Sequence, residues 1–221
     1  MLHKRITYSR FTNFNPYSAK NDQSIAYEII IMLNKKVPTP NLEQYTSANF
    51  SRGRAAVIEV AWIFISMLLV TSFVPGVRHR IFLLRFFGAR LGKGVVVKPG
   101  VKVKFPWRLT VGDHSWIGEG AWIDNLASVT IGANACISQG AYLCTGNHDW
   151  SATTFNLKTE SILLQDGSWV AARAVVGPGV TVGHNAVVAL GAVATRDIPP
   201  GRILFASGKL AERSRTIEEG V

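Results

Sequence analysis

The chain contains 221 residues, of which 48% are hydrophobic and 17% are charged, and its formal net charge is +10. This length accommodates one catalytic domain with an extension, and the composition does not fit a polytopic membrane protein. The two cysteines, Cys136 and Cys144, form neither a disulfide framework nor a metal-binding pattern, which favours a reducing cytoplasmic setting.

The positive charge is concentrated in the first part of the chain. Residues 1–90 contain 12 Lys and Arg against 4 Asp and Glu, whereas residues 91–221 contain 12 against 10. A basic segment of this kind indicates an anionic partner, either a nucleic acid or a membrane surface. The sequence has no recognisable nucleic-acid-binding motif and no basic strands interleaved with aromatic residues. We therefore expect no nucleic acid and favour an anionic membrane surface.

An almost wholly apolar run occupies residues 55–74 and predicts a helix. Such a run is long enough to cross the ~30 Å hydrocarbon core of a bilayer. Glu59 interrupts it, however, and arginines flank both of its ends, so the charges select no orientation. Three interpretations remain open: a helix that lies in the membrane interface, a helix that packs on the protein, and a helix that spans the membrane.

A second helix is predicted from Val77 to Phe87, and a repeat with a period of six begins at Leu91. One aliphatic residue marks each repeat, often with glycine directly after it and a small residue four positions later. The marking residues are Leu91, Val97, Val103, Val111, Ile117, Ile123, Ile131, Ile137, Leu143, Val170, Val176, Val182, Val188 and Ala194.

A period of six matches neither the 3.6-residue turn of a helix nor the alternation of a plain strand, so it indicates a repeat architecture. Three six-residue segments complete one triangular coil, with the aliphatic side chain inside and the small residue near a corner. Stacked coils complete one another's backbone hydrogen bonds and bury a continuous aliphatic column. The sequence therefore predicts a mainly β chain: a parallel β-helix over residues 91–221, including a C-terminal tail, after a basic, helical extension over residues 1–90.

Four motifs give residues 80–215 a resemblance to a known family. They are His-Ser-Trp-Ile-Gly at 114–118, Thr-Gly-Asn-His-Asp at 145–149, Asp-Gly-Ser-Trp-Val at 166–170 and Asp-Ile-Pro-Pro at 197–200. With them the chain resembles the hexapeptide-repeat acyltransferases, and most of all the acetyltransferases of colanic-acid-type exopolysaccharide gene clusters. The resemblance implies a left-handed β-helix and an O-acetyltransferase that uses acetyl-CoA as co-substrate and no metal. It also implies a homotrimer and a glycan or lipid-linked sugar as acceptor.

His148 is the candidate general base. The repeat breaks after Leu143, and we expect a loop excursion over residues 149–168 with His148 at its start. A neutral imidazole can remove the proton of a sugar hydroxyl as its oxygen attacks a thioester carbonyl. The resemblance implies the same role, with direct transfer to the acceptor. The alternatives are a structural corner histidine and a covalent route through Cys144.

The other candidate site residues divide into two groups. Asp149, Asp124 and Asn125 are candidates for binding the acceptor, because the first follows His148 and the other two lie in the coil beneath it. For coenzyme A, the resemblance implies contacts in the late coils from Trp169, Ala172, Leu190, Thr195 and Arg196. Lys209 and Arg213 are candidate partners of the nucleotide phosphates, because cations pair with phosphate, although both also fit a solvated surface.

Two alternatives compete with this interpretation. One is a β-helix that docks on a membrane as an interaction module. The other is a trimeric β-helix of the carbonic anhydrase kind, whose zinc site requires three converging histidines, whereas His114, His148 and His184 fall in different phases of the repeat. We favour the enzyme and, because acetyl-CoA is cytoplasmic, expect it in the cytoplasm at the inner face of the cytoplasmic membrane.

Overall fold

The computed structural model describes residues 38–47 and 50–211. The chain divides into two compact units, Met1–Pro40 and Asn41–Val221. Within the described residues, all the helices and strands lie in the second unit.

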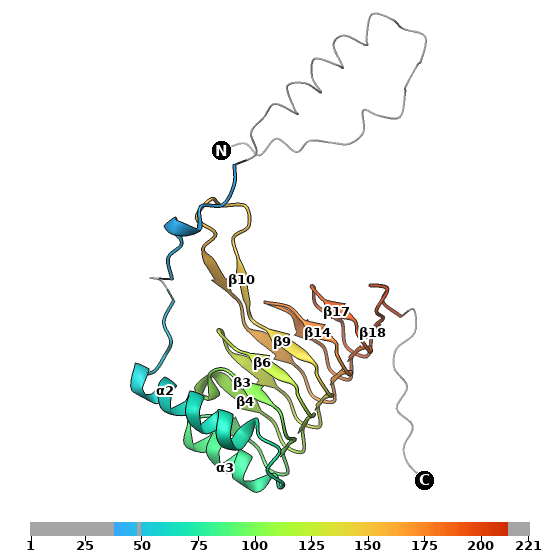
Figure 1. The fold of residues 1–221 in the computed structure, drawn as a ribbon. Helices are drawn as coiled ribbons and strands as arrows, with labels where there is room; N and C mark the ends of the chain where they lie inside the picture. The colour runs from blue at the N-terminus through green and yellow to red at the C-terminus, as the bar shows by residue number, and fades with distance from the viewer. Residues whose placement is uncertain (1–37, 48–49, 212–221) are drawn as a thin grey trace, which may run out of the picture. The chain divides into compact units, whose positions relative to one another are not determined.

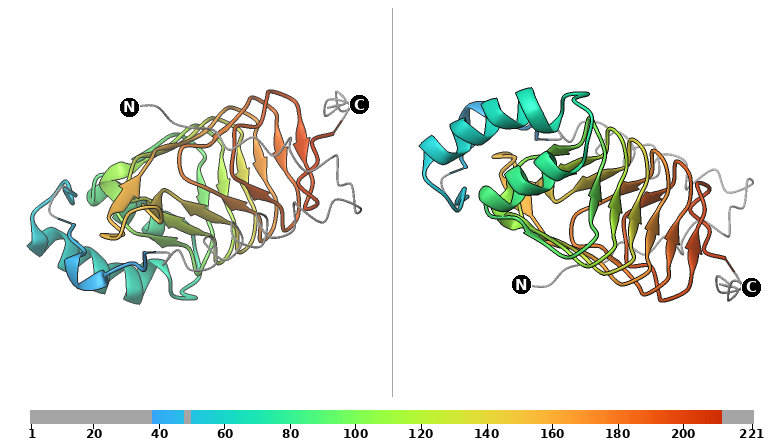
Figure 2. Two further views of the ribbon diagram at one scale, coloured as in Figure 1. Left: turned by 90° about the horizontal axis from the view of Figure 1, so that it is seen from above. Right: turned by 90° about the horizontal axis from the view of Figure 1, so that it is seen from below.

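The chain winds in stacked coils to form a β-helix, and its three faces are three parallel sheets (Figures 1 and 2). The first contains β1 (Arg90–Leu91), β4 (Leu109–Val111), β7 (Val129–Ile131), β12 (Ile162–Leu164) and β15 (Thr181–Val182). The second contains β2 (Val96–Val97), β5 (Trp116–Ile117), β8 (Cys136–Ile137), β13 (Trp169–Val170), β16 (Val187–Val188) and β18 (Ile203–Leu204). The third contains β3 (Lys102–Val103), β6 (Trp122–Asp124), β9 (Tyr142–Cys144), β14 (Val175–Val176) and β17 (Val193–Ala194). The predicted parallel β-helix is confirmed.

The repeat produces this fold because each coil pairs in register with the next. Ile117 of β5 pairs with Ile137 of β8, for example, and Ile137 pairs with Val170 of β13. These aliphatic side chains are buried and form one continuous core, whereas the residues that alternate with them point outward.

The corner after β3 departs from the six-residue period. A 3-10 helix, η4 (Pro106–Arg108), occupies it, and Asn125 lies in the equivalent corner of the next coil. Asn125 is fully buried, accepts a hydrogen bond from the Phe105 backbone N–H (2.9 Å) and donates one to the Phe105 carbonyl (2.7 Å). Its amide group thus replaces the ladder bonds that the irregular corner cannot make.

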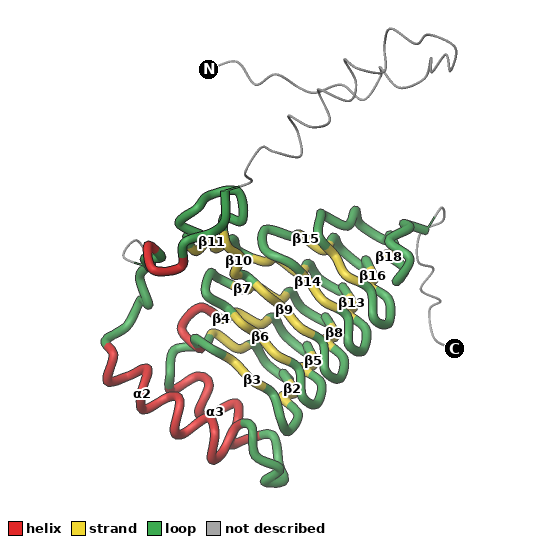
Figure 3. Tube along the Cα trace, turned by 45° about the horizontal axis from the view of Figure 1, so that its top comes forward, coloured by secondary structure: helices red, strands yellow, loops and turns green. Residues whose placement is uncertain are grey.

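The excursion from the β-helix is shorter than the predicted 149–168. The chain departs at β10 (Gly146–His148), turns, and returns along β11 (Leu157–Thr159), which pairs with β10 in an antiparallel hairpin. It rejoins the first sheet at β12, where Ile162 and Leu164 point into the core. Figure 3 shows this hairpin projecting from the stacked coils.

A helical layer covers the first coils of the β-helix. It consists of α2 (Ala56–Ile65), which continues as a π-helix, η3 (Ser66–Val70), and of α3 (Arg78–Phe86). Trp62, Val70, Leu84 and Phe87 are buried in the common core, and the Trp62 indole donates a hydrogen bond to the Val103 carbonyl (2.9 Å). The layer therefore closes the end of the aliphatic column, which would otherwise be exposed to solvent.

Two buried charged groups of this layer have polar partners. The carboxylate of Glu59, which interrupts the apolar run, forms an ion pair with Arg52. The guanidinium of Arg80 donates to the carbonyl oxygens of Val70, Ser72, Val74 and Gly76, and so fixes the turn between η3 and α3. In the part of the chain that the structure describes, no helix is both long and apolar enough to cross a membrane.

Candidate active site

The hairpin holds His148 by one nitrogen. His148 pairs with Leu157 at the end of β10, and its Nδ1 lies 2.9 Å from the carbonyl oxygen of Phe155. Because a carbonyl can only accept, Nδ1 carries a proton, so that in the neutral ring the free electron pair is on Nε2. Among residues 38–47 and 50–211, none forms a hydrogen bond to Nε2. The half-buried imidazole is thus oriented as a proton acceptor.

Two aromatic rings flank the imidazole, and the sequence analysis missed both. The ring of Phe155 stacks on it with centroids 4.4 Å apart and an interplanar angle of 5°. Phe155 has a φ of 49°, a left-handed conformation that is unusual for a bulky residue. Tyr45, more than 100 positions earlier in the chain, contacts the imidazole at 5.7 Å between centroids.

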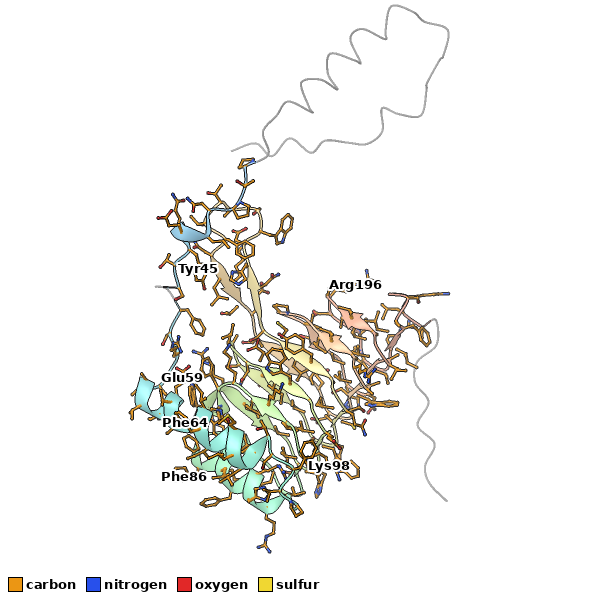
Figure 4. The ribbon with its side chains drawn as sticks, viewed as in Figure 1. Tyr45, Glu59, Phe64, Phe86, Lys98 and Arg196 are labelled. Atoms are coloured by element: carbon orange, nitrogen blue, oxygen red, sulfur yellow. The ribbon has the colours of Figure 1, made fainter. Side chains whose placement is uncertain are left out.

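Tyr45 reaches His148 because the segment that carries it lies against the hairpin. This segment includes a short 3-10 helix, η2 (Leu42–Gln44), and the Asn41 N–H donates to the carbonyl of Thr153 in the hairpin loop (2.8 Å). Figure 4 shows Tyr45 beside the hairpin. No repeat or motif connects residues 41–45 with residues 148–155, so only the structure could bring them together.

Asp149 does not contact the imidazole. Its carboxylate accepts hydrogen bonds from the Ser151 hydroxyl and backbone N–H and forms an ion pair with Lys158 (3.0 Å). These interactions, with the Ser151 hydroxyl first, lower the pKa of Asp149 to about 2. Asp149 is therefore ionised near neutral pH and stabilises the turn of the hairpin, while the Phe155 carbonyl orients His148.

Asp124 lies at the end of β6, opposite Cys144, on the outward face of the third sheet. It pairs with Lys104 (3.4 Å) and accepts a hydrogen bond from the Tyr142 hydroxyl (3.2 Å). Burial, followed by the neighbouring Cys144 and Asp124, raises the pKa of Tyr142, so its hydroxyl stays protonated and able to donate. Such a set of carboxylate, ammonium and phenol groups can bind sugar hydroxyls.

Asn125, the third acceptor candidate, has a different place. It is fully buried, and both ends of its amide are bonded to the backbone of Phe105. The amide cannot reach a substrate from this position, so we leave Asn125 out of the acceptor site. Its role is to hold the irregular corner together.

The candidates for coenzyme A lie on the late coils. Trp169 is 40% exposed on β13, and its indole N–H donates to the Ser138 hydroxyl (2.9 Å). Ala172 and Leu190 lie in neighbouring corners, where the Gly191 N–H donates to the Ala172 carbonyl (3.1 Å). Thr195, Arg196 and Lys209 are exposed at the C-terminal end (Figure 4 labels Arg196), and Arg213 lies outside the described residues.

The Cys144 thiol, the alternative nucleophile, donates to the Gly146 carbonyl (3.2 Å). Within the described ranges, no three His, Cys, Asp or Glu side chains are grouped so as to hold a metal ion.

Comparison with known proteins identifies relatives along most of the chain. No family model matches it. It is 35% identical over 170 residues to the "Putative colanic acid biosynthesis acetyltransferase WcaF" of Escherichia coli (strain K12), which corresponds to 77% of this chain and 93% of that protein. It is 28% identical over 127 residues to the galactoside O-acetyltransferase of the same organism, or 56% of this chain and 63% of that protein.

Solved structures have the same fold. A hexapeptide-repeat acetyltransferase from Vibrio cholerae O1 biovar eltor, complexed with acetyl coenzyme A, matches with a TM-score of 0.68 and 22% sequence identity. The match covers 76% of this chain and 92% of that chain.

Proposed function

Because the chain belongs to the family of hexapeptide-repeat acetyltransferases, as its motifs predicted, we propose that it transfers an acetyl group from acetyl-CoA to a sugar hydroxyl. The observation that carries this proposal is the imidazole of His148, whose Nδ1 is held by the Phe155 carbonyl. The names of its relatives, which refer to colanic acid biosynthesis and to a galactoside, favour an acceptor in exopolysaccharide or related glycan biosynthesis.

In the proposed reaction Nε2 of His148 removes the proton of the sugar hydroxyl while the oxygen attacks the thioester carbonyl. The imidazolium that forms is stabilised by its Nδ1–H bond to the Phe155 carbonyl. The tetrahedral intermediate then collapses, the carbon–sulfur bond breaks, and the coenzyme A thiolate takes the proton from His148. The acetyl group passes directly to the sugar, without an intermediate on Cys144.

We assign each of the two substrates, the sugar acceptor and acetyl-CoA, to a group of residues on the outside of the β-helix. Asp124, with Lys104 and Tyr142, is the proposed acceptor contact, and Asp149 supports the hairpin beside it. Coenzyme A would lie along the late coils, over Trp169, Ala172 and Leu190, near Thr195 and Arg196. Lys209 and Arg213 would meet its phosphates, since cations pair with them. In this scheme residues 91–221 form the catalytic domain and residues 1–90 its extension.

The purified chain is expected to release free coenzyme A thiol from acetyl-CoA faster in the presence of a suitable glycan. A thiol-reactive dye measures the release, and mass spectrometry of the glycan finds an added acetyl group. Candidate acceptors are galactosides, exopolysaccharide oligosaccharides and lipid-linked oligosaccharide fractions. Thiol release that no glycan in this series accelerates, together with no acetylated product, would favour a non-catalytic interaction module instead.

We also propose that three copies of the chain assemble as a homotrimer. The outward faces of the second and third sheets expose Trp116 and Trp122 at 56% and 42%, and burial of such side chains between copies is favourable. Light scattering at micromolar concentration in a mild detergent is expected to give three times the mass of one chain. A monomer under these conditions would contradict the assignment.

The proposed location is the cytoplasm, at the inner face of the cytoplasmic membrane. Acetyl-CoA is available on that side, and a membrane position would bring the site close to a lipid-linked acceptor. The basic character of residues 1–90 supports this location, because anionic lipids attract Lys and Arg.

A further inference from the structure

The helical layer that closes the β-helix has apolar side chains on both of its faces. Trp62 and Val70 point into the core, yet the opposite side of α2 and η3 is not polar. It exposes Val57 at 73%, Phe64 at 58% and Leu68 at 63%. A helix that is apolar on all sides is ordinarily buried on all sides, so the outer side of this layer requires a partner.

The turn after η3 and the helix α3 extend the same apolar surface. Phe73, Phe82 and Phe86 are exposed at 76%, 65% and 72%, and the rings of Phe82 and Phe86 stack with centroids 6.2 Å apart. Figure 4 shows Phe64 and Phe86 on the helical layer. We refer to the exposed side chains of Val57, Val60, Phe64, Leu68, Phe82 and Phe86 as the helical face. A contiguous apolar surface of this kind marks an interaction site.

A groove opens in the helical face between α2 and the end of α3. Its volume is about 510 Å³, and its lining is apolar (Val57, Ala61, Ile65 and Phe86) except for the guanidinium of Arg54. This volume lies in the range of small-molecule sites. An apolar groove with one cation suits a hydrocarbon chain that carries an anionic head group.

The positive charges around the helical face indicate an anionic partner. Residues 50–98 contain eight Lys and Arg and one acidic residue, Glu59, which is buried against Arg52. Arg54 lines the groove, and Arg78 is exposed at the start of α3, without a carboxylate of this segment to neutralise either of them. A second copy of the chain would place the same cations opposite one another, which is unfavourable. An anionic bilayer complements both the apolar surface and the charge.

We propose that the helical face binds the surface of an anionic bilayer and that the groove takes the acyl chain of one lipid, with Arg54 beside its phosphate. In this proposal α2, η3 and α3 lie in the membrane interface and do not cross the bilayer. This inference deepens the membrane location proposed above and rests on it, but it does not depend on the chemistry of His148. The layer that closes the β-helix thereby also anchors it.

The test uses the full chain and two kinds of vesicle, phosphatidylcholine alone and phosphatidylcholine with phosphatidylglycerol. The wild type is expected to float with the anionic vesicles and to bind neutral ones more weakly. The double variant Phe64→Asp/Phe86→Asp is expected to lose more than about tenfold in affinity, because two apolar side chains no longer enter the interface. Arg54→Gln/Arg78→Gln is expected to lose about fivefold per arginine on anionic vesicles only.

Leu163→Asp provides the matched control, because Leu163 is an exposed apolar residue (38%) on the first sheet of the β-helix. It should bind vesicles like the wild type. Circular dichroism and acetyl transfer to a soluble acceptor, measured for every variant, separate loss of binding from loss of folding and from failure of the proposed function. A wild type that floats but transfers no acetyl group would refute the enzyme and leave the anchor intact.

Three results would overturn the inference. The first is a wild type that does not float with either kind of vesicle, which would mean that the helical face does not bind a bilayer and that a second copy of the chain covers it instead. The second is a folded double variant that floats like the wild type. The third is equal binding to neutral and anionic vesicles, which would remove the role of the arginines. Light scattering of the double variant identifies the first case, since loss of an interface between copies lowers the mass.

Discussion

His148→Ala is expected to lower kcat by about two to four orders of magnitude, the usual cost of removing a general base. The alanine variant has no group at the end of β10 that could take the proton from the acceptor hydroxyl. The binding of coenzyme A should change little, because its proposed contacts lie on the late coils. Thiol release under saturating acetyl-CoA and acceptor measures kcat, and calorimetry measures the affinity for coenzyme A.

A second substitution tests the way in which His148 is held. Phe155→Leu keeps the carbonyl that binds Nδ1 but removes the ring that stacks on the imidazole. It should therefore lose much less activity than His148→Ala and should shift the pH profile of kcat/KM if the ring positions the base. Near-normal turnover of His148→Ala, with the acceptor present, would refute the mechanism. The same loss in both variants would instead indicate that the hairpin had lost its structure.

Asn125→Leu is expected to destabilise the chain by about 2–5 kcal/mol, the largest stability effect that we predict. The substitution leaves the N–H and the carbonyl of Phe105 buried without partners, and each such group costs about 1–3 kcal/mol. Leucine has the same branching and the same number of side-chain heavy atoms, so it leaves no cavity, and the loss of hydrogen bonds dominates the effect. Denaturant titration measures the free energy of unfolding directly.

Asn134→Gly is the control for this measurement. Asn134 lies in an exposed corner with a φ of 52°, a conformation that glycine adopts without strain. Its substitution should change the stability by less than about 0.5 kcal/mol. If Asn125→Leu were equally harmless, the amide would not be needed at the irregular corner. An acceptor role for Asn125 would then have to be considered again.

The regular part of the fold could be predicted because the repeat encodes it locally. Each aliphatic residue, such as Ile117 or Val176, fills the interior of its own coil, and its neighbours in space are the same residues of the next repeats. The excursion was placed too far along the chain because Leu164 lacks the glycine that often follows the marking residue. Leu164 nevertheless stands six residues before Val170, with Ser168 four positions after it, so the phase itself contained the signal.

The candidate site could be predicted only in part, because its geometry depends on the backbone and on distant contacts. The motif around residue 148 identified the histidine, whereas its partner is a carbonyl, a group that every residue has. Asn125 was assigned to the acceptor because polar residues near a site suggest binding, but the irregular corner uses its amide internally. The sequence of the apolar run at 55–74 did not determine whether the run contacts the protein or a membrane. The structure shows that one side packs on the β-helix and the other is exposed.

The contact between Asn41 and Thr153 has a consequence for the order in which the chain folds. Each coil of the β-helix pairs with the next one along the chain, as in Trp116 and Cys136, so the coils can form one after another during synthesis. The segment around Tyr45 must wait until the hairpin has been made, more than 100 residues later. Closing so long a loop costs entropy that few contacts offset. Hydrogen exchange should therefore show residues 41–45 opening well before the core, so that the surroundings of His148 are the last part to form and the first to loosen.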